Sequence, residues 1–225
     1  MNHVRIAIDG PAGAGKSTVA RTVAKRLGIL YVDTGAMYRG VAWLAQTYGV
    51  SPSDEAGLVA MLREHPLTCG RSEHDTVDIL ADGRVITQEL RSPAVSGMVS
   101  ELSAHPAVRD ILTALQRDFS RHESVVMDGR DIGTVVMPDA DVKIFLTADL
   151  DERARRRLSE MEGQGFCVDY QELRATMAER DARDASRPVA PLRQAPDAIV
   201  VDSTGKSVED VADEILSIAR QVLHG

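Results

Sequence analysis

The residues best suited to chemistry in this 225-residue chain lie near its start, in a glycine-rich loop that ends in lysine and serine. The loop reads Gly10-Pro11-Ala12-Gly13-Ala14-Gly15-Lys16-Ser17, which fits G-x-x-x-x-G-K-[ST] between an apolar run and a segment of helical apolar spacing. Its glycines let the backbone wrap closely round a phosphate, and amide groups at a helix N-terminus face the anion. We therefore expect a nucleoside triphosphate site over Gly10–Thr18, with Lys16 on the β- and γ-phosphates and Ser17 as a ligand of Mg²⁺.

The rest of the chain limits which kind of phosphate-loop protein this is. Regulatory GTPases read guanine with an Asn-Lys-x-Asp element, and protein kinases need an asparagine in their catalytic loop. The only asparagine in the sequence is Asn2, so neither element is present. A large mechanical ATPase would need a longer chain. A small-molecule kinase is the best remaining class.

A second polar segment follows the apolar run 29–32 and reads Asp33-Thr34-Gly35-Ala36-Met37-Tyr38-Arg39. Arg39 offers a forked donor for a phosphate, and Tyr38 can lie against a sugar. A solvated arginine on a helix is the alternative interpretation of Arg39.

A third segment follows the run 125–127 and reads Asp128-Gly129-Arg130-Asp131-Ile132-Gly133-Thr134. Asp128 stands where a carboxylate that holds Mg²⁺, directly or through water, is expected. Arg130 and Asp131 add one strong donor and one strong acceptor. A tight turn with a surface ion pair is the alternative.

Two arginine-rich segments lie further along the chain. Arg153, Arg156 and Arg157 share the i, i+3, i+4 spacing of one helical face, and Gly163-Gln164-Gly165 can serve as a hinge. We expect a mobile lid over about 151–167 that brings positive charge onto phosphates; an RNA-binding arginine patch is the alternative. In the segment 179–187, Arg180, Arg183 and Arg187 also share a face, and internal ion pairing with Asp184 is an equally good interpretation.

A scaffold that positions these segments is indicated by five short apolar runs, 4–8, 29–32, 125–127, 142–146 and 199–201. Four of them end at an aspartate and one ends at a threonine. Such runs predict buried parallel strands, whose carboxyl edge is where open α/β sheets bind ligands.

The segments between these runs indicate helices and one hairpin. Helices are predicted before Gly28, from Pro106, and after the cap Ser207-x-x-Asp210. The last helix has an apolar stripe that we expect in the core, at Val208, Val211, Ile215, Ile218 and Val222. The Asp82-Gly83 turn within 76–86 predicts a hairpin, and hence a small antiparallel insertion over about 65–95.

The composition sets limits on partners and compartment. The formal net charge of −8 argues against a dedicated nucleic-acid binder. Cys69 and Cys167 have no metal-type spacing and make no disulfide framework, which fits a reducing compartment. No signal peptide is visible, and no apolar run approaches the ~18 residues that cross a bilayer. We expect a cytoplasmic monomer that binds neither nucleic acid nor membrane.

Taken together, these segments resemble bacterial cytidylate kinases. The resemblance rests on GPAGAGKS, DTGAMYR, DGRDIGTVVMPDADVKIFLTA, the arginine-rich lid, ERDARDASRPVAPL and DST, in order from about Val4 to the last helix. It implies a single P-loop nucleoside monophosphate kinase domain over 1–225, with a central parallel five-stranded sheet flanked by helices. The core would be 1–64, 96–150 and 168–225, with a nucleotide-binding insertion over about 65–95 and a lid over about 151–167.

The resemblance also implies the reaction, which is transfer of the γ-phosphoryl of MgATP to CMP or dCMP, and the role of each site residue. The acceptor phosphate would be held by Thr34, Arg39, Arg130 and Arg187. The sugar would be held by Tyr38, Arg180 and Asp184. Cytosine would be read by Ser100, Arg109 and Asp131. The ATP phosphates would be approached by the lid-side arginines Arg153, Arg157 and Arg183, which join Lys16 and Arg130 in the expected catalytic set.

The chemistry of cytosine fits this assignment. Asp131 and Ser100 can accept from its 4-amino group, and Arg109 can donate to N3 and O2. Uracil reverses the polarity at positions 3 and 4, which by analogy with base-edge readout costs ~1–3 kcal/mol per mismatched contact. We expect in-line transfer without a covalent intermediate, driven by positioning and charge neutralisation. The remaining alternatives are a kinase of the same fold for UMP or shikimate, an RNA-binding module, and a nucleotide sensor without activity.

Overall fold

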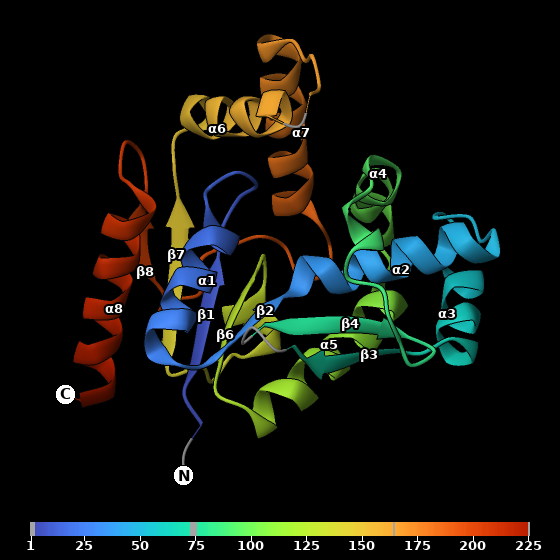
Figure 1. Cartoon of the computed structure of the whole chain (residues 1–225), viewed down its shortest axis with the longest axis horizontal. Helices are drawn as coiled ribbons and strands as arrows, with labels where there is room; N and C mark the ends of the chain where they lie inside the picture. Colours follow the sequence, from blue (N-terminus) through green and yellow to red (C-terminus); the bar gives the residue numbers. More distant parts are fainter. Residues whose placement is uncertain (1–2, 73–75, 164, 225) are drawn as a thin grey trace.

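A parallel sheet forms the centre of the computed structural model, which describes residues 3–72, 76–163 and 165–224. Its five strands lie in the order β2-β6-β1-β7-β8, and every neighbouring pair is parallel (Figure 1). Their bounds are Arg5–Asp9 for β1, Leu30–Asp33 for β2, Val125–Gly129 for β6, Val142–Thr147 for β7 and Ile199–Asp202 for β8. The sequence prediction of five parallel strands is confirmed.

Helices cover both faces of this sheet, which explains why its strands are apolar almost throughout. Successive residues of β1 point to opposite faces: Ile6 and Ile8 pack with α1 (Lys16–Leu27) and α8 (Val208–His224), whereas Ala7 packs on the other side. That other side carries four helices, α2 (Thr34–Tyr48), α3 (Glu55–Glu64), α4 (Pro93–Leu102) and α5 (Pro106–His122). The sheet therefore separates two hydrophobic cores.

A small antiparallel sheet adds to the second core. It has the order β3-β4-β5, with bounds Leu67–Arg71, Val77–Ala81 and Arg84–Val85, and is followed by the short helix η1 (Glu89–Arg91). Asp82 and Gly83 both have positive φ, 51° and 77°, as a type I′ hairpin turn requires. The predicted hairpin is confirmed, and β3 joins it as a third strand. Residues 73–75 of the predicted insertion lie outside the described residues.

Two long helices stand above the carboxyl edge of the central sheet (Figure 1). They are α6 (Leu150–Gly163), which follows β7, and α7 (Tyr170–Ser186). Gln164, the middle residue of the predicted hinge, lies outside the described residues. A single π-helical turn, η2 (Ile132–Val136), follows β6 at the same edge. The site described below is built at this edge.

The last helix departs from its prediction in one respect. The cap is confirmed, since Ser207 Oγ accepts from the Asp210 amide at 3.1 Å and Asp210 Oδ2 accepts from the Ser207 amide at 3.3 Å. The apolar stripe was wrong at both ends, because Val208 and Val222 are 39% and 49% exposed. The buried face instead includes small residues that allow close packing; its members are Val211, Ala212, Ile215, Leu216 and Ala219. Within the described residues, no helix is both long and apolar enough to cross a membrane.

Candidate active site

The glycine-rich loop connects β1 to α1, and its shape depends on two close approaches. A Cβ on Gly10 would lie 1.9 Å from the Leu146 carbonyl oxygen, so only glycine lets the chain leave β1 beside β7. Gly13 has φ 76°, and a Cβ there would meet Arg153 backbone and side-chain atoms at 3.1–3.2 Å. Gly15 caps α1 in the left-handed region with φ 85°. The loop thus presents the open N-terminus of α1 to an anion.

Lys16 lies buried within its own loop. Its Nζ donates to the Pro11 carbonyl at 2.7 Å. Burial lowers the pKa of the Lys16 ammonium well below its ordinary value, and the nearby Arg130 adds to the effect. Thr18, the last residue of the predicted set, lies exposed on the first turn of α1. A phosphate entering this loop would place negative charge beside the buried Lys16 ammonium and so favour its protonated form.

Asp128 is the centre of a buried hydrogen-bond network. Its two carboxylate oxygens accept from Ser17 Oγ and from the Tyr31 hydroxyl, each at 2.9 Å, and its carbonyl accepts from Thr34 Oγ1 at 2.7 Å. Burial, with a further contribution from Asp33, raises the pKa of Asp128 to about 6. Sequence reasoning missed Tyr31, because it reaches Asp128 only through the pairing of β2 with β6.

The donors around Asp128 suit a hard divalent cation. Hydroxyl and carboxylate oxygens are the ligands that Mg²⁺ prefers, and Mg²⁺ usually takes only one or two of them from the protein. Among the described residues no cluster of three metal-binding side chains exists. Ser17 and Asp128 offer oxygen ligands that fit Mg²⁺.

A second carboxylate, Asp9, lies buried at the end of β1. It accepts from the backbone amides of Ile132 at 2.8 Å and Gly133 at 2.7 Å, which begin η2. Burial raises the pKa of Asp9 to about 6, against the effect of these two hydrogen bonds. The sequence marked Asp9 only as one of four aspartates that end strands.

Arg109 and Asp131 form a preformed ion pair beside Tyr38. Their side chains are 4% and 9% exposed, and Arg109 Nη2 lies 2.6 Å from Asp131 Oδ2. Arg109 also donates to the Ser103 carbonyl at 3.1 Å and lies over the Tyr38 ring, 5.5 Å from its centroid. Burial raises the pKa of Tyr38 to about 12. The structure thus brings together two of the three residues expected to read a base.

Two arginines expected at the acceptor phosphate, Arg130 and Arg39, pair with carboxylates, and Arg180, expected at the sugar, is buried. Arg130 Nε donates to Asp184 Oδ2 at 3.0 Å, and Arg39 pairs with Asp33 at 2.7 Å. Asp33 also caps α2 through the Ala36 amide. Burial lowers the pKa of Arg180, and Arg130 lowers it further.

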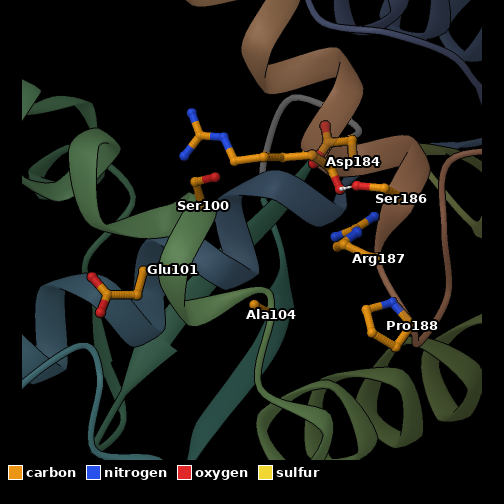
Figure 2. A pocket seen from close by; sticks show the side chains of 8 residues that line it. Ser100, Glu101, Ala104, Asp184, Ser186, Arg187 and Pro188 are labelled. Atoms are coloured by element: carbon orange, nitrogen blue, oxygen red, sulfur yellow. Dashed lines mark hydrogen bonds between the residues drawn. The ribbon is translucent and has the colours of Figure 1, made fainter.

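A pocket of about 450 Å³ opens between the end of α4 and the end of α7 (Figure 2). Its lining is Ser100, Glu101, Ala104, Arg183, Asp184, Ser186, Arg187 and Pro188. Arg187 Nε is buried without a hydrogen-bond partner, and burial together with Arg109 lowers the pKa of Arg187. Arg187 lies beyond the end of α7 in an extended conformation, so its predicted place on one helical face with Arg180 and Arg183 was wrong. An anion in this pocket would lie near Arg183 and Arg187, beside the carboxylates of Glu101 and Asp184.

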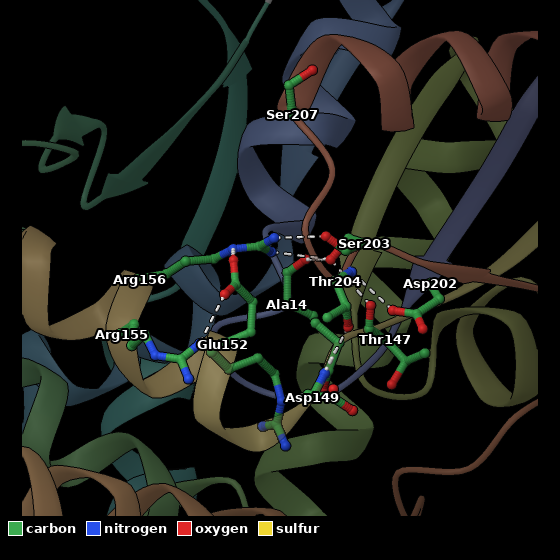
Figure 3. A network of polar contacts seen from close by, with 12 residues as sticks. Ala14, Thr147, Asp149, Glu152, Arg155, Arg156, Asp202, Ser203, Thr204 and Ser207 are labelled. Carbon is green, nitrogen blue, oxygen red and sulfur yellow. Dashed lines mark hydrogen bonds and ion pairs between the residues drawn. The ribbon is translucent and has the colours of Figure 1, made fainter.

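The three arginines of α6 that the sequence placed on one face turn to three different partners. Arg153 is buried, donates to the Ala12 carbonyl of the glycine-rich loop at 3.1 Å, and pairs with Asp181 of α7. Arg156 donates to Ser203 Oγ at 3.0 Å and to the Ser203 carbonyl at 2.6 Å (Figure 3). Arg157 is half-exposed and pairs with Glu160 within its own helix. The helical spacing predicted one positive face, but the structure does not bring these side chains together.

Ser203 joins the loop after β8 to the glycine-rich loop (Figure 3). Its hydroxyl lies 3.1 Å from both the Ala14 and the Thr147 carbonyls, and its amide donates to the Thr147 carbonyl at 2.9 Å. Sequence reasoning noted DST only as part of a resemblance and gave Ser203 no role. A small polar residue directly after a strand at the ligand-binding edge was the available signal.

Comparisons with known proteins agree with this geometry. A family model described as cytidylate kinase matches residues 6–221. A cytidylate kinase of a Geobacillus species is 46% identical over 98% of this chain and 98% of its own. A bifunctional pantoate ligase/cytidylate kinase of a Synechococcus species is 49% identical over 97% of this chain, which spans 41% of that longer protein. A solved structure of an uncharacterized protein from Eubacterium ventriosum shares the fold, with a TM-score of 0.56 at 16% identity over 98% of this chain and 99% of its own.

Proposed function

The chain belongs to the cytidylate kinase family, and from this premise we propose that it transfers the γ-phosphoryl of MgATP to CMP or dCMP, giving ADP and CDP or dCDP. The observation that carries the proposal is the buried Arg109–Asp131 pair. It lies on the same sheet edge as the glycine-rich loop, because Asp131 follows β6 and the loop follows β1. Arg109 as donor and Asp131 as acceptor would match the edge of cytosine beside the proposed triphosphate site.

The donor half would bind ATP through the glycine-rich loop. The amides at the start of α1 and the Lys16 ammonium would hold the β- and γ-phosphates. When bound, Mg²⁺ supplies positive charge to the phosphate oxygens, and Ser17 and Asp128 are the residues that would hold it. Lys16 would turn from the Pro11 carbonyl to phosphate oxygens, because a charged oxygen is a stronger acceptor for the ammonium group than a neutral carbonyl is.

The acceptor half would hold CMP by its three parts. The phosphate would contact the hydroxyl and guanidinium groups of Thr34, Arg39, Arg130 and Arg187. The sugar would lie against Tyr38, Arg180 and Asp184. The base would be read by Ser100, Arg109 and Asp131. The Arg130–Asp184 bond uses only the Nε of Arg130 and one carboxylate oxygen of Asp184, which leaves other polar atoms of both residues for substrate.

The transfer itself would need no general base and no covalent intermediate. An oxygen of the CMP 5′-phosphate is already ionised at pH 7 and attacks the γ-phosphorus, while the bond to the β-phosphate oxygen breaks. Two phosphates repel each other, so most of the catalysis is alignment and neutralisation of charge by Lys16 and the arginines.

We further propose that segment 151–167 acts as a lid and that segment 65–95 is the insertion on the nucleotide-binding side. Lid closure would exclude water, which would otherwise take the γ-phosphoryl. Arg153, Arg157 and Arg183 would then approach the ATP phosphates. Arg153 and Arg156 donate hydrogen bonds to other parts of the chain, which argues against the alternative that these arginines form an RNA-binding patch.

The test is release of ADP from ATP with CMP, dCMP, UMP, AMP or GMP as acceptor, with the diphosphate product identified. We expect CDP and dCDP as main products and far lower rates with the purine nucleotides. A rate with UMP that equals the rate with CMP would remove the cytosine-reading role of Arg109 and Asp131. ADP release that is independent of any acceptor would leave only an ATPase.

A further inference from the structure

We propose that Asp9 is a positioning residue that fixes the turn carrying Arg130 and Asp131 relative to the glycine-rich loop. This inference rests on the proposed function. Asp9 is the last residue of β1, and Gly10 directly after it begins the loop. One residue thereby holds the donor loop through its backbone and the acceptor turn through its side chain.

The contact is a two-oxygen clamp on the start of η2. Asp9 Oδ1 accepts from the Ile132 amide at 2.8 Å, and Oδ2 accepts from the Gly133 amide at 2.7 Å. Arg130 and Asp131 directly precede these two amides. The Asp9 residue as a whole is 4% exposed, so water cannot readily replace the two bonds.

Among the described residues, the remaining hydrogen bonds of η2 are internal or come from Arg117 of α5, and they do not tie it to β1. Val135 and Val136 both donate to the Asp131 carbonyl, and Met137 donates to the Ile132 carbonyl. A Cβ on Gly133 would lie 3.2 Å from Lys143 Cδ and 3.4 Å from Asp9 Oδ2, so a larger residue would press on Lys143 directly beside the clamp. The first two amides of the turn are therefore left for Asp9, and they fix where the turn begins.

The functional consequence follows from the geometry of in-line transfer. Donor and acceptor phosphates must be aligned, and a misplacement of about 1 Å can cost about 100-fold in rate. Loss of the clamp should shift the acceptor turn but leave the loop amides and Lys16 in place. We therefore expect a loss in the use of CMP without a loss of ATP binding.

The matched pair of variants is Asp9→Asn and Asp141→Asn. Asp141 also accepts a backbone bond on β1, from the Arg5 amide at 2.8 Å, but at the opposite end of the strand and far from the loop. Asp9→Asn keeps the size of the side chain, but its amide NH2 group would face one of the two backbone N–H donors. A third variant, Gly133→Ala, disturbs the clamp from the other side without altering a buried charge.

For Asp9→Asn we expect kcat/KM for CMP to fall about 10–100-fold, from the cost of misalignment, while the Kd for ATP measured by calorimetry stays unchanged. The ratio of CDP formed to ATP consumed should also fall, because misaligned ATP is lost to water. Gly133→Ala should show the same signature more weakly, and Asp141→Asn should behave like wild type.

The proposal is overturned if Asp9→Asn and Asp141→Asn have equal effects, or if ATP affinity falls as much as CMP use. Hydrogen exchange supplies a readout that needs no activity: the Ile132 and Gly133 amides should exchange faster in Asp9→Asn, and unchanged exchange would also refute the clamp. A wild-type enzyme that makes no CDP would refute the proposed function, while the exchange comparison would still decide the role of Asp9.

Discussion

The glycine-rich loop and the arginine-rich helices α6 and α7 both offer positive potential to phosphates, but they are built in different ways. The loop uses backbone amides of consecutive residues, and glycines with positive φ at positions 13 and 15 set its shape. The helices use long side chains, and each side chain finds its own partner. A backbone site is thus determined locally, whereas a side-chain site depends on which acids the fold brings near.

The arginines of α6 illustrate the second case. Arg153 pairs with Asp181, 28 residues away, and Arg156 bonds to Ser203, 47 residues away, while Arg157 stays within its own helix. The three share a helical spacing that predicts one common face. Their environments differ because α7 and the loop after β8 pack against different sides of α6. Four experiments test how far this contrast extends.

The largest effect is expected in the loop itself. Lys16→Met should lower turnover by several orders of magnitude, because it removes the charge that stabilises the transferring phosphoryl. Circular dichroism should show an intact fold, since methionine fills the buried space of the lysine stem. The measurement is ADP release that depends on CMP.

Lys25→Met is the matched control, on the exposed last turn of the same helix. It should change turnover little. Activity of Lys16→Met within about tenfold of wild type, a loss of only ~1.4 kcal/mol, would remove the loop from the proposed mechanism and with it the contrast drawn above.

The next effect concerns the pH dependence of stability that Asp9 confers. The pKa of Asp9 in the folded protein is about 6, raised by burial from an ordinary value of 3.8. A raised pKa means that the folded state holds the proton more tightly than the unfolded state. The contribution of Asp9 to the free energy of unfolding is therefore largest below pH 4 and declines as pH rises to about 6, by about 3 kcal/mol in total.

Urea unfolding at a series of pH values tests this. The difference in unfolding free energy between wild type and Asp9→Asn should shift against wild type between about pH 4 and pH 6, then level off, because asparagine does not titrate. A difference that is constant across this range would mean that Asp9 is not perturbed by burial.

Much of the fold was predictable because its signals are local. The apolar runs gave all five strands of the central sheet, and the Asp82-Gly83 turn gave the hairpin with its two positive φ angles. Strand β3 was harder to identify, because Leu67–Arg71 contains a glycine and lacks clear alternation. Val208 and Val222 were misplaced because helical spacing alone does not say where the flank of a buried face ends.

The site was predictable in part for the same reason. The loop residues could be identified and given a chemical task from the sequence. The Tyr31–Asp128 and Arg109–Asp131 contacts could not, since they join residues that are 97 and 22 positions apart. The resemblance placed Arg109 and Asp131 at a base without indicating that they bind each other. Such pairings depend on strand order and helix packing, which no local pattern encodes.

A third experiment separates base reading from phosphate binding on the acceptor turn. Asp131→Asn should lower the ratio of kcat/KM for CMP over UMP about 10–100-fold, which corresponds to ~1–3 kcal/mol for one polar contact. Asparagine is preferable to alanine, because its amide oxygen can still accept a hydrogen bond from Arg109, whereas alanine would leave the buried guanidinium without that acceptor. Arg130→Ala should damage both substrates about equally, since both carry the same phosphate. An unchanged ratio in Asp131→Asn, with both rates lowered, would make Asp131 a structural partner of Arg109.

The smallest effects distinguish two arginines of α6 that helical spacing placed on one face but that the structure gives different partners. Arg153 is buried and bonds to the Ala12 carbonyl, whereas Arg157 is half-exposed. Arg153→Met should lower the free energy of unfolding of the unliganded protein by about 1–2 kcal/mol, because it leaves Asp181 and the Ala12 carbonyl without their donor. Arg157→Met should change it by less than about 0.5 kcal/mol, as is usual for an exposed ion pair.

Hydrogen exchange of the loop amides then decides whether the two regions are mechanically linked. If Arg153 braces the loop, Arg153→Met should raise exchange at residues 12–15 in the absence of nucleotide, whereas Arg157→Met should not. Both variants should reduce protection of 153–163 when a bisubstrate analogue is added, if both arginines reach ATP phosphates in a closed lid. Equal loop exchange in the two variants would show that the backbone-built site holds its shape alone. The Arg153 side chain would then serve the lid only, and the contrast between the two regions would be complete.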